Sequence, residues 1–300
     1  MRNIDIPTLR SLLIYLAYTL AAAGLTALWP VFSRAGARRS DPSAGAALFS
    51  VFAVLGGAAA AHLSGSLSHL LALPASDLVN LALAGLVTAF LWLCLYTALT
   101  GGLCTRVFAA VNLSFLAVLL IDSLLSRTLP GLWSLCAAVV VLLGTVLILS
   151  RRQGMKGQVW FVYAMLAMLA SAGLSLLKAR GFSAAVDGAL FGFGRSAVAC
   201  VLLWAFVLVR GRQKKLKDMT AAGRICTPLA GLALSGVWVL ETLRAAGQAH
   251  DWSRYAPVSA GWFLLMVLFS RWFLKEKLPG ASVFGALLVT AGTVGILMGI

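Results

Sequence analysis

The stretch that decides the fold is Ser270-Arg271-Trp272-Phe273-Leu274-Lys275-Glu276-Lys277-Leu278-Pro279-Gly280, which is followed by Ala281–Ile300. This last segment contains no charged residue over about 20 positions, which is the length of one bilayer crossing. A shorter copy of the same turn, Arg127-Thr128-Leu129-Pro130-Gly131, precedes the apolar segment Leu132–Ser150 half a chain earlier. The sequence therefore predicts a membrane protein that is built from two copies of one unit.

The composition agrees with a chain that is embedded in a membrane throughout. Apolar residues make up 61% of the chain, charged residues make up 11%, and the mean hydropathy is +0.96. A soluble domain of this length has too little polar surface to cover so many apolar side chains. We expect an all-α membrane protein with about ten transmembrane helices, at Leu12–Phe32, Ala44–Leu63, Leu78–Leu99, Arg106–Leu125, Leu132–Ser150, Val159–Leu177, Ala185–Val209, Ile225–Ala246, Tyr255–Phe273 and Ala281–Ile300.

The net charge of +15 is explained by the membrane rather than by nucleic acid as a partner. Lys and Arg gather in the cytoplasmic connections of membrane proteins. In the ten-helix arrangement, about 16 of the 24 basic residues fall in alternate connections, including the segment Arg210–Lys217, and about 7 fall on the other side. This asymmetry predicts that those connections are cytoplasmic and that both termini are outside.

The repeat defines two units, residues 1–152 and residues 153–300. Arg106 and Arg254 are 148 residues apart, as are Gly144 and Gly292, each of which is followed by Thr-Val. Each unit therefore holds five helices. Because five is odd, the second unit enters the bilayer in the opposite orientation, and we predict two inverted five-helix repeats.

The order of several motifs resembles the drug/metabolite transporter superfamily, of the EamA-like kind. The resemblance is carried by Phe193-Gly194-Arg195-Ser196, by Trp238–Ala246 followed by Ala256-Pro257, by Leu274–Leu278 and by Gly292. The first half departs from the family pattern in three places: no arginine near Phe52, Asn112-Leu113-Ser114 near a usual proline, and Arg127 where an acidic turn residue is expected. The resemblance implies a ten-helix transporter that works by alternating access.

Polar and aromatic stripes on two predicted helices mark a candidate substrate cavity. Trp92 and Tyr96 share one helix face with Thr88, and Trp238 and Glu241 share a face on the equivalent helix of the second repeat. Such aromatic walls stack on a solute or attract a cation. The same stripes also fit an interfacial aromatic belt or ordinary packing. Asn112 is a further candidate for the cavity wall, or for a hydrogen bond between helices.

Three charged residues in or near the predicted helices have two interpretations each. Glu241 either binds substrate or a proton, or forms a local ion pair with Arg244, three residues further on. Arg195 either holds an anionic group or clamps helices together, and the family resemblance favours the structural role. We expect Glu276 to hold the basic turn before the last helix and to act on stability more than on substrate choice.

The sequence carries no pattern that indicates an enzyme, a metal site or a cofactor. The three histidines lack an acidic partner at a catalytic spacing, and no glycine-rich phosphate loop is present. The predicted function is secondary transport of a small metabolite, such as an amino acid or an amine, across the plasma or inner membrane. The alternative is a non-transporting membrane subunit, or a partner of a lipid-linked flippase, with the same fold. Proton or ion coupling and a homodimer are both compatible with the sequence.

Overall fold

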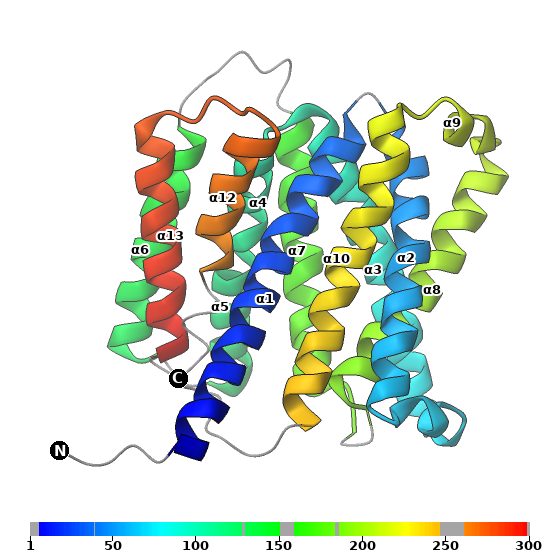
Figure 1. The fold of residues 1–300 in the computed structure, drawn as a ribbon, viewed down its shortest axis with the longest axis horizontal. Helices are drawn as coiled ribbons and strands as arrows, with labels where there is room; N and C mark the ends of the chain where they lie inside the picture. The colour runs from blue at the N-terminus through cyan, green and yellow to red at the C-terminus, as the bar shows by residue number, and fades with distance from the viewer. Residues whose placement is uncertain are drawn as a thin grey trace.

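The chain folds into a bundle of helices that run between two ends of the molecule (Figure 1). The computed structural model describes residues 6–38, 40–127, 130–150, 159–183, 186–246 and 261–298. These residues form helices and no strand. The helices are α1 (Ile6–Ala37), α2 (Pro42–Leu63), η1 (Ser66–Ala72), α3 (Ala75–Gly101), α4 (Cys104–Asn112), α5 (Ser114–Ser126), α6 (Leu132–Leu149), α7 (Val159–Arg180), α8 (Gly188–Val209), α9 (Gln213–Lys217), α10 (Ala221–Ala246), α12 (Trp262–Phe273) and α13 (Gly280–Met298).

Eight helical segments among the described residues are long and apolar enough to cross a bilayer. One of them, Cys104–Ser126, comprises α4 and α5, which are separated by a turn at Leu113. Two shorter apolar helices, α12 and α13, follow in the last part of the chain. Every segment predicted from the sequence overlaps one of these helices, although the start of the ninth, at Tyr255, lies outside the described residues.

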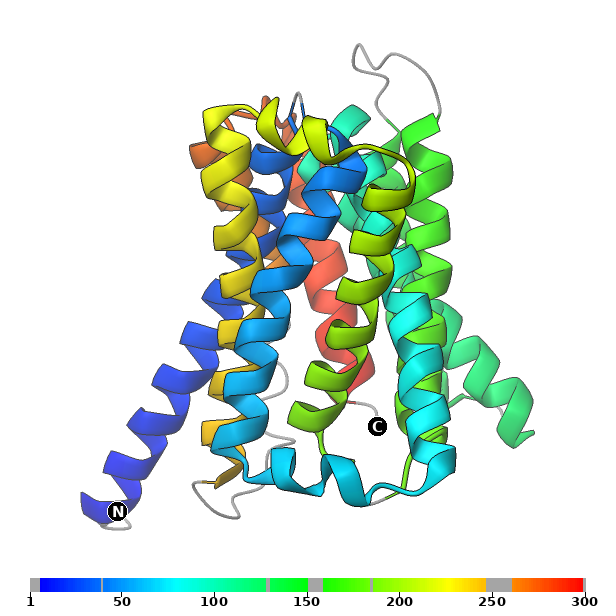
Figure 2. The same ribbon diagram turned by 90° about the vertical axis from the view of Figure 1, so that its right-hand side faces the viewer.

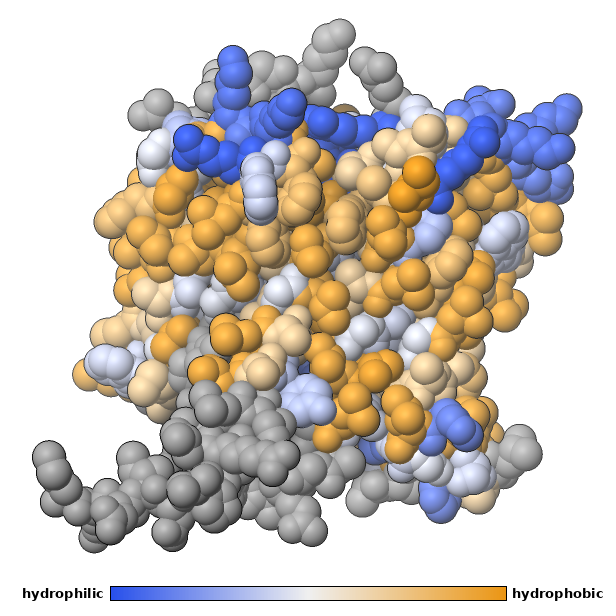
Figure 3. All heavy atoms as spheres, viewed as in Figure 1, coloured by the Kyte–Doolittle hydropathy of each residue, from blue (hydrophilic) through white to orange (hydrophobic). Residues whose placement is uncertain are grey.

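The outer surface of the bundle is apolar, as expected of helices that face lipid. Leu124 and Leu132 are 77% and 79% exposed. The space-filling view shows a broad apolar zone between two more polar ends (Figure 3). An apolar surface of this extent would be in contact with water in a soluble monomer, so it indicates a multi-pass membrane protein.

Most of the described basic connections lie at one end of the bundle, which we call the basic end. It holds the α1–α2, α8–α10 and α12–α13 connections, with Arg38, Arg210, Lys215, Lys217 and Lys277 (Figures 1 and 3). At the opposite end α1 begins, α13 ends, and η1 lies across the bundle between α2 and α3 (Figure 2). The charge asymmetry expected from the sequence is therefore also an asymmetry between two ends of the folded chain.

Glycines let α6 and α13 approach each other closely. A Cβ atom on Gly285 would lie 2.6 Å from the carbonyl oxygen of Gly144, and a Cβ atom on Gly144 would lie 2.6 Å from the carbonyl oxygen of Gly285. A Cβ on Gly292 would come within 2.8 Å of the Ala137 carbonyl. Small residues at such contacts are typical of helix pairs in membranes, where close packing replaces the hydrophobic effect.

Candidate functional site

A cavity of about 400 Å³ lies inside the bundle and is lined from both halves of the chain. Its walls come from α1, α3, α4, α5, α7, α8, α10 and α12. Most of the lining is apolar or aromatic and includes Trp29, Phe108, Phe191 and Trp262. A largely apolar cavity of this size with a few polar groups is typical of a binding site for a small organic molecule.

The cavity extends from the middle of the bundle toward the end opposite the basic end. On α7 its lining runs from Ser171 to Lys178, which is two residues before the helix ends at Arg180. On α8 the lining includes Gly188, the first residue of that helix, and on α10 it reaches Glu241. The cavity therefore approaches one end of the molecule.

Aromatic side chains pack in pairs at the cavity. Trp29 and Phe108 meet edge to face with their ring centroids 5.1 Å apart. Phe49 and Trp92 meet in the same way at 5.0 Å, and Trp92 is only 2% exposed. Edge-to-face pairs of this kind add to the stabilisation that burial itself provides. We call Trp29, Phe49, Trp92 and Phe108 the aromatic layer.

Four of the five residues predicted to bind substrate line this cavity: Trp92, Asn112, Trp238 and Glu241. They come from α3, α4 and α10, and Arg195 on α8 joins them. Their roles in binding stay predictions.

Tyr96 is the exception, because it does not line the cavity. Its side chain is fully buried and lies against Gly45 and Phe49 of α2. Positions 92 and 96 share a helix face, but each turn moves the side chain about 5.4 Å along the axis. Tyr96 lies in the packed part of the bundle against α2 in this conformation, and its role in binding substrate stays a prediction.

Arg195 reaches the cavity between two aromatic rings. Its Cζ atom lies 5.4 Å from the centroid of the Phe191 ring and 5.3 Å from that of the Trp238 ring. Its Nη1 lies 3.4 Å from the hydroxyl oxygen of Thr88, a long hydrogen bond, and none of the residues that the structure describes is a hydrogen-bond partner of its buried Nε. Trp238 was predicted from the sequence as a ring that attracts a cation, and the cation that it contacts here is the Arg195 guanidinium.

Sequence reasoning did not identify Phe191 and Lys178 as part of the site. Lys178 lines the cavity from α7, and its Nζ lies 5.8 Å from the centroid of the Phe191 ring. Phe191 and Arg195 are four residues apart on one helix, a spacing that brings side chains together. This spacing was the only signal in the sequence that could have indicated the contact between Phe191 and Arg195.

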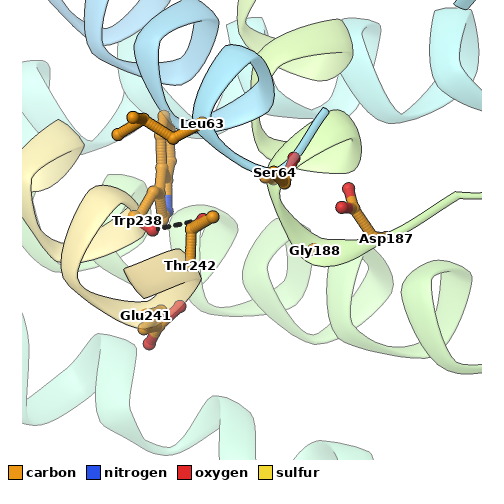
Figure 4. A pocket seen from close by; sticks show the side chains of 8 residues that line it. Leu63, Ser64, Asp187, Gly188, Trp238, Glu241 and Thr242 are labelled. Carbon is orange, nitrogen blue, oxygen red and sulfur yellow. Dashed lines mark hydrogen bonds between the residues drawn. The ribbon is translucent and has the colours of Figure 1, made fainter. Parts of the chain in front are cut away.

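A second, smaller cavity of about 330 Å³ adjoins the first near the end opposite the basic end. Figure 4 shows residues that line it, with Trp238, Glu241 and Thr242 of α10 on one side and Ser64 and Asp187 on the other. The two cavities share Gly188, Trp238 and Glu241. Glu241 is exposed and has a polar or electrostatic interaction of its own. The side chain of Arg244, its predicted partner, lies outside the described residues.

Glu276 is not among the residues that line the cavity and lies in the connection between α12 and α13. Its side chain is completely buried, and Oε1 accepts a hydrogen bond of 3.0 Å from the backbone N–H of Cys104, the first residue of α4. Oε1 also lies 3.9 Å from Nε of Arg34 on α1, and Thr105 donates to Oε2 at 3.5 Å. Burial raises the pKa of the Glu276 carboxyl above its ordinary value, although the Cys104 N–H and the Arg34 charge oppose this shift. The geometry is that of a connection between helices, as expected for a residue that acts on stability.

Among the described residues, no group of three or more His, Cys, Asp or Glu side chains is placed to hold a metal ion. The side chains that line the cavity offer aromatic stacking, hydrogen bonding and charge.

Comparisons with known proteins report on the fold alone. No family model matches the sequence, and no curated protein matches it. The chain is similar to a protein of known crystal structure that shares 16% sequence identity with it, and the similarity covers 93% of this chain and 96% of that chain with a TM-score of 0.61. An identity this low carries no information about substrate or activity. The resemblance to the drug/metabolite transporter superfamily thus stays a prediction.

Proposed function

We propose that the protein is a secondary transporter that moves a small organic solute across a cell membrane by alternating access. The observation that carries this proposal is the central cavity, which is lined from both halves of the chain and reaches toward the end opposite the basic end. A transporter of this class has such a cavity near the middle of the bilayer, between two repeats. We further propose that the chain crosses the plasma or inner membrane ten times.

Three pairs of positions support an arrangement in two repeats at the offset of 148 residues. Arg127 and Lys275 are 148 residues apart, and they are the non-glycine residues with positive φ among those described, at 54° and 52°. The starts of α5 and α12, at Ser114 and Trp262, have the same separation. So do the starts of α6 and α13. Left-handed backbone is uncommon outside glycine, so its recurrence at matching turns favours a duplicated unit.

The packing of the helices also agrees with two repeats related by a two-fold axis. If α1, α2, α3 and α6 correspond to α7, α8, α10 and α13, the pairs α1–α10 and α2–α10 correspond to α7–α3 and α8–α3. All four pairs are in extensive contact. The pairs α2–α8 and α6–α13 are also in extensive contact, and the exchange of the two repeats converts each of these pairs into itself. An inverted repeat produces this exchange of partners.

In the proposed orientation the basic end faces the cytoplasm, because cytoplasmic connections concentrate Lys and Arg. Both termini then lie outside, and the cavity approaches the exterior in the conformation described here. The aromatic layer of Trp29, Phe49, Trp92 and Phe108 would form the closed side of the pathway. In the opposite state of the transport cycle this layer would open and the outer side would close.

The decisive experiment is uptake by liposomes that contain the purified protein and no other protein. A panel of radiolabelled amino acids, amines and carboxylates is offered, and we expect protein-dependent entry of at least one solute. Ser175→Trp places a large side chain on a cavity-lining position of α7, and it should reduce uptake to background. Leu169→Trp is the matched control, because it places the same side chain on an exposed position of the same helix.

Folding of both variants is checked by their melting temperatures. If folded protein moves no solute of the panel, the transport proposal is wrong and the alternative, a non-transporting membrane subunit or a partner of a lipid-linked flippase, is favoured. Equal loss of uptake in both tryptophan variants would show that the cavity described here is not the pathway.

A further inference from the structure

The ionisable groups of the central cavity give it an excess of positive charge. Among the residues that line it, Lys178 and Arg195 are basic and Glu241 is acidic. In the described part of the chain, no carboxylate lies within ion-pair distance of Arg195 or Lys178. Both cations also lie near the ring of Phe191, at 5.4 and 5.8 Å, so the two charges are within about 11 Å of each other.

Arg195 is not satisfied by the contacts that it makes. A guanidinium carries five N–H donors in its plane. The long bond of 3.4 Å from Nη1 to Thr88 uses one of these donors, while the buried donor at Nε has no partner within the described part of the chain. A buried charge without a counter-ion is costly, and the loss is recovered when an anion with matching acceptors arrives.

The two rings around Arg195 leave its donors available. Phe191 and Trp238 both lie within cation–π distance of the guanidinium carbon. Neither ring offers an oxygen or nitrogen acceptor, so these contacts stabilise the charge without giving the guanidinium N–H groups a conventional hydrogen-bond acceptor. The two rings therefore hold in the cavity wall a cation that can still donate to a carboxylate.

We propose that the solute taken up by this cavity is a small organic carboxylate with an aromatic or apolar body. The proposal rests on the transport function argued above, and it deepens that function by assigning the chemical class of the substrate. The carboxylate binds at the edge of the Arg195 guanidinium, and the body lies against the apolar wall that includes Trp29, Phe108 and Trp262. Lys178, nearer to the opening, attracts the anion on entry.

The same contacts argue against a cation as the solute. The sequence predicted that the Trp238 ring could attract a cationic solute, but in the structure this ring is in contact with the Arg195 guanidinium. A second positive group at this ring would meet repulsion from Arg195. Glu241 offers a carboxylate near the opening, but it already has an interaction of its own.

The test uses three probes with the same phenylpropyl skeleton and different charge: 3-phenylpropionate, 3-phenylpropanol and 3-phenylpropylamine. Binding to the purified full-length protein is measured by calorimetry and by the shift in melting temperature. We expect the carboxylate to bind at least tenfold more tightly than the alcohol or the amine. The proposal is overturned if the carboxylate does not bind, or if the alcohol or the amine binds equally well.

Substitutions of Arg195 then test whether this residue binds the carboxylate group of 3-phenylpropionate. Arg195→Gln should weaken binding of 3-phenylpropionate by about 10- to 150-fold, the range expected for hydrogen bonds to a charged group. Arg195→Lys keeps the positive charge but lacks the planar pair of donors. Its affinity for 3-phenylpropionate should therefore lie between that of the wild type and that of Arg195→Gln. Arg210→Gln is the matched control, because Arg210 also stacks on a ring, at 5.1 Å from Phe206, but lies outside the cavity at the basic end. Unchanged affinity in folded Arg195→Gln would refute the assignment, and if that variant does not fold, Arg195→Lys and the probe series decide.

The results separate this proposal from the transport function on which it rests. If 3-phenylpropionate binds through Arg195 and yet no solute enters the liposomes, the carboxylate site stands and the transport function is wrong. If the liposomes take up only amines or neutral solutes, transport stands and the carboxylate assignment is wrong.

Discussion

Removal of the Glu276 carboxylate should destabilise the fold, because one buried group holds three segments together. It accepts the N–H of Cys104 at 3.0 Å, lies 3.9 Å from the Nε atom of Arg34, and belongs to the connection that leads into α13. Glu276→Ala leaves a buried N–H at the start of α4 without a partner. It also removes the carboxylate that lies near the Arg34 guanidinium, and the Arg34 side chain is only 10% exposed.

The magnitude follows from these two losses. An unpaired buried N–H costs about 1–3 kcal/mol. Breaking a fully buried ion pair costs about 3–5 kcal/mol, but the contact of 3.9 Å is longer than a hydrogen bond and Arg34 also donates to the Leu99 carbonyl. We therefore expect Glu276→Ala to lower the free energy of unfolding by about 2–4 kcal/mol in total. Glu276→Gln keeps an oxygen for the Cys104 N–H, so its cost should be about 1 kcal/mol or less.

The assay is thermal unfolding of the purified protein in detergent, followed by its tryptophan fluorescence. Glu276→Ala should melt several degrees below the wild type, and Glu276→Gln should lie between them. Lys277→Ala is the control, because Lys277 is the exposed neighbour of Glu276 in the same turn. The reasoning would be refuted if the melting temperature of Glu276→Ala equalled that of the wild type, or if it were no lower than that of Glu276→Gln.

The raised pKa of Glu276 adds a dependence on pH with a definite sign. Burial disfavours the charged carboxylate, so the pKa in the folded protein lies above the ordinary value of 4.5. A carboxyl with a raised pKa contributes stability that is present below the ordinary pKa and is lost as the pH rises through the folded pKa. The melting temperature of the wild type relative to Glu276→Gln should therefore fall as the pH rises above 4.5. A relative melting temperature that rises over this range would contradict the assignment.

Further predictions concern the cavity, the orientation and the α6–α13 contact. Trp238→Ala and Trp92→Leu should each weaken binding of the same solute about five- to thirtyfold, because each removes an aromatic wall. A reporter fused after Lys217 should lie in the cytoplasm, and one fused after the last residue should lie outside, as the basic end requires. Gly285→Ala should cost about 1–3 kcal/mol, measured by thermal unfolding, because its Cβ would meet a backbone carbonyl of α6 at 2.6 Å. Gly24→Ala, whose Cβ would meet nothing within 4 Å, should show no such loss.

Each of these has a result that contradicts it. Leu93→Ala, on the same helix as Trp92 but outside the cavity lining, should bind normally, and equal impairment there would remove the case for an aromatic wall. A reporter found in the cytoplasm after the last residue would reverse the proposed orientation. A stable Gly285→Ala variant would show that the α6–α13 contact adjusts freely.

The apolar helices could be predicted from the sequence because a candidate span is recognised by its length and by the absence of charge, and both are visible there. α6 begins at Leu132 as expected, and α13 begins at Gly280, one residue before the predicted start. The turn at Leu113, which divides α4 from α5, was not predicted. The averaged hydropathy of Cys104–Ser126 stays high in spite of Asn112 and Ser114 beside the turn, so hydropathy shows one uninterrupted span.

The site was harder to predict, because a helical pattern shows which face a residue lies on but not what faces it. Trp92 and Tyr96 share a face, but only Trp92 meets the cavity, since the neighbouring α2 covers Tyr96. The contact of Arg195 with Trp238 joins α8 to α10 across 43 positions of sequence. No spacing within one helix could reveal that contact, which needs the folded arrangement of two helices.

The central cavity contains four of the nine tryptophans of the chain: Trp29, Trp92, Trp238 and Trp262. Indole emission responds to the polarity and charge around the ring, so this cavity carries its own optical reporter. A solute that displaces water from these rings, or that draws the Arg195 guanidinium away from Trp238, changes the emission spectrum without an attached dye. Occupancy of the site could thus be followed in real time in the unlabelled protein, in detergent or in a membrane.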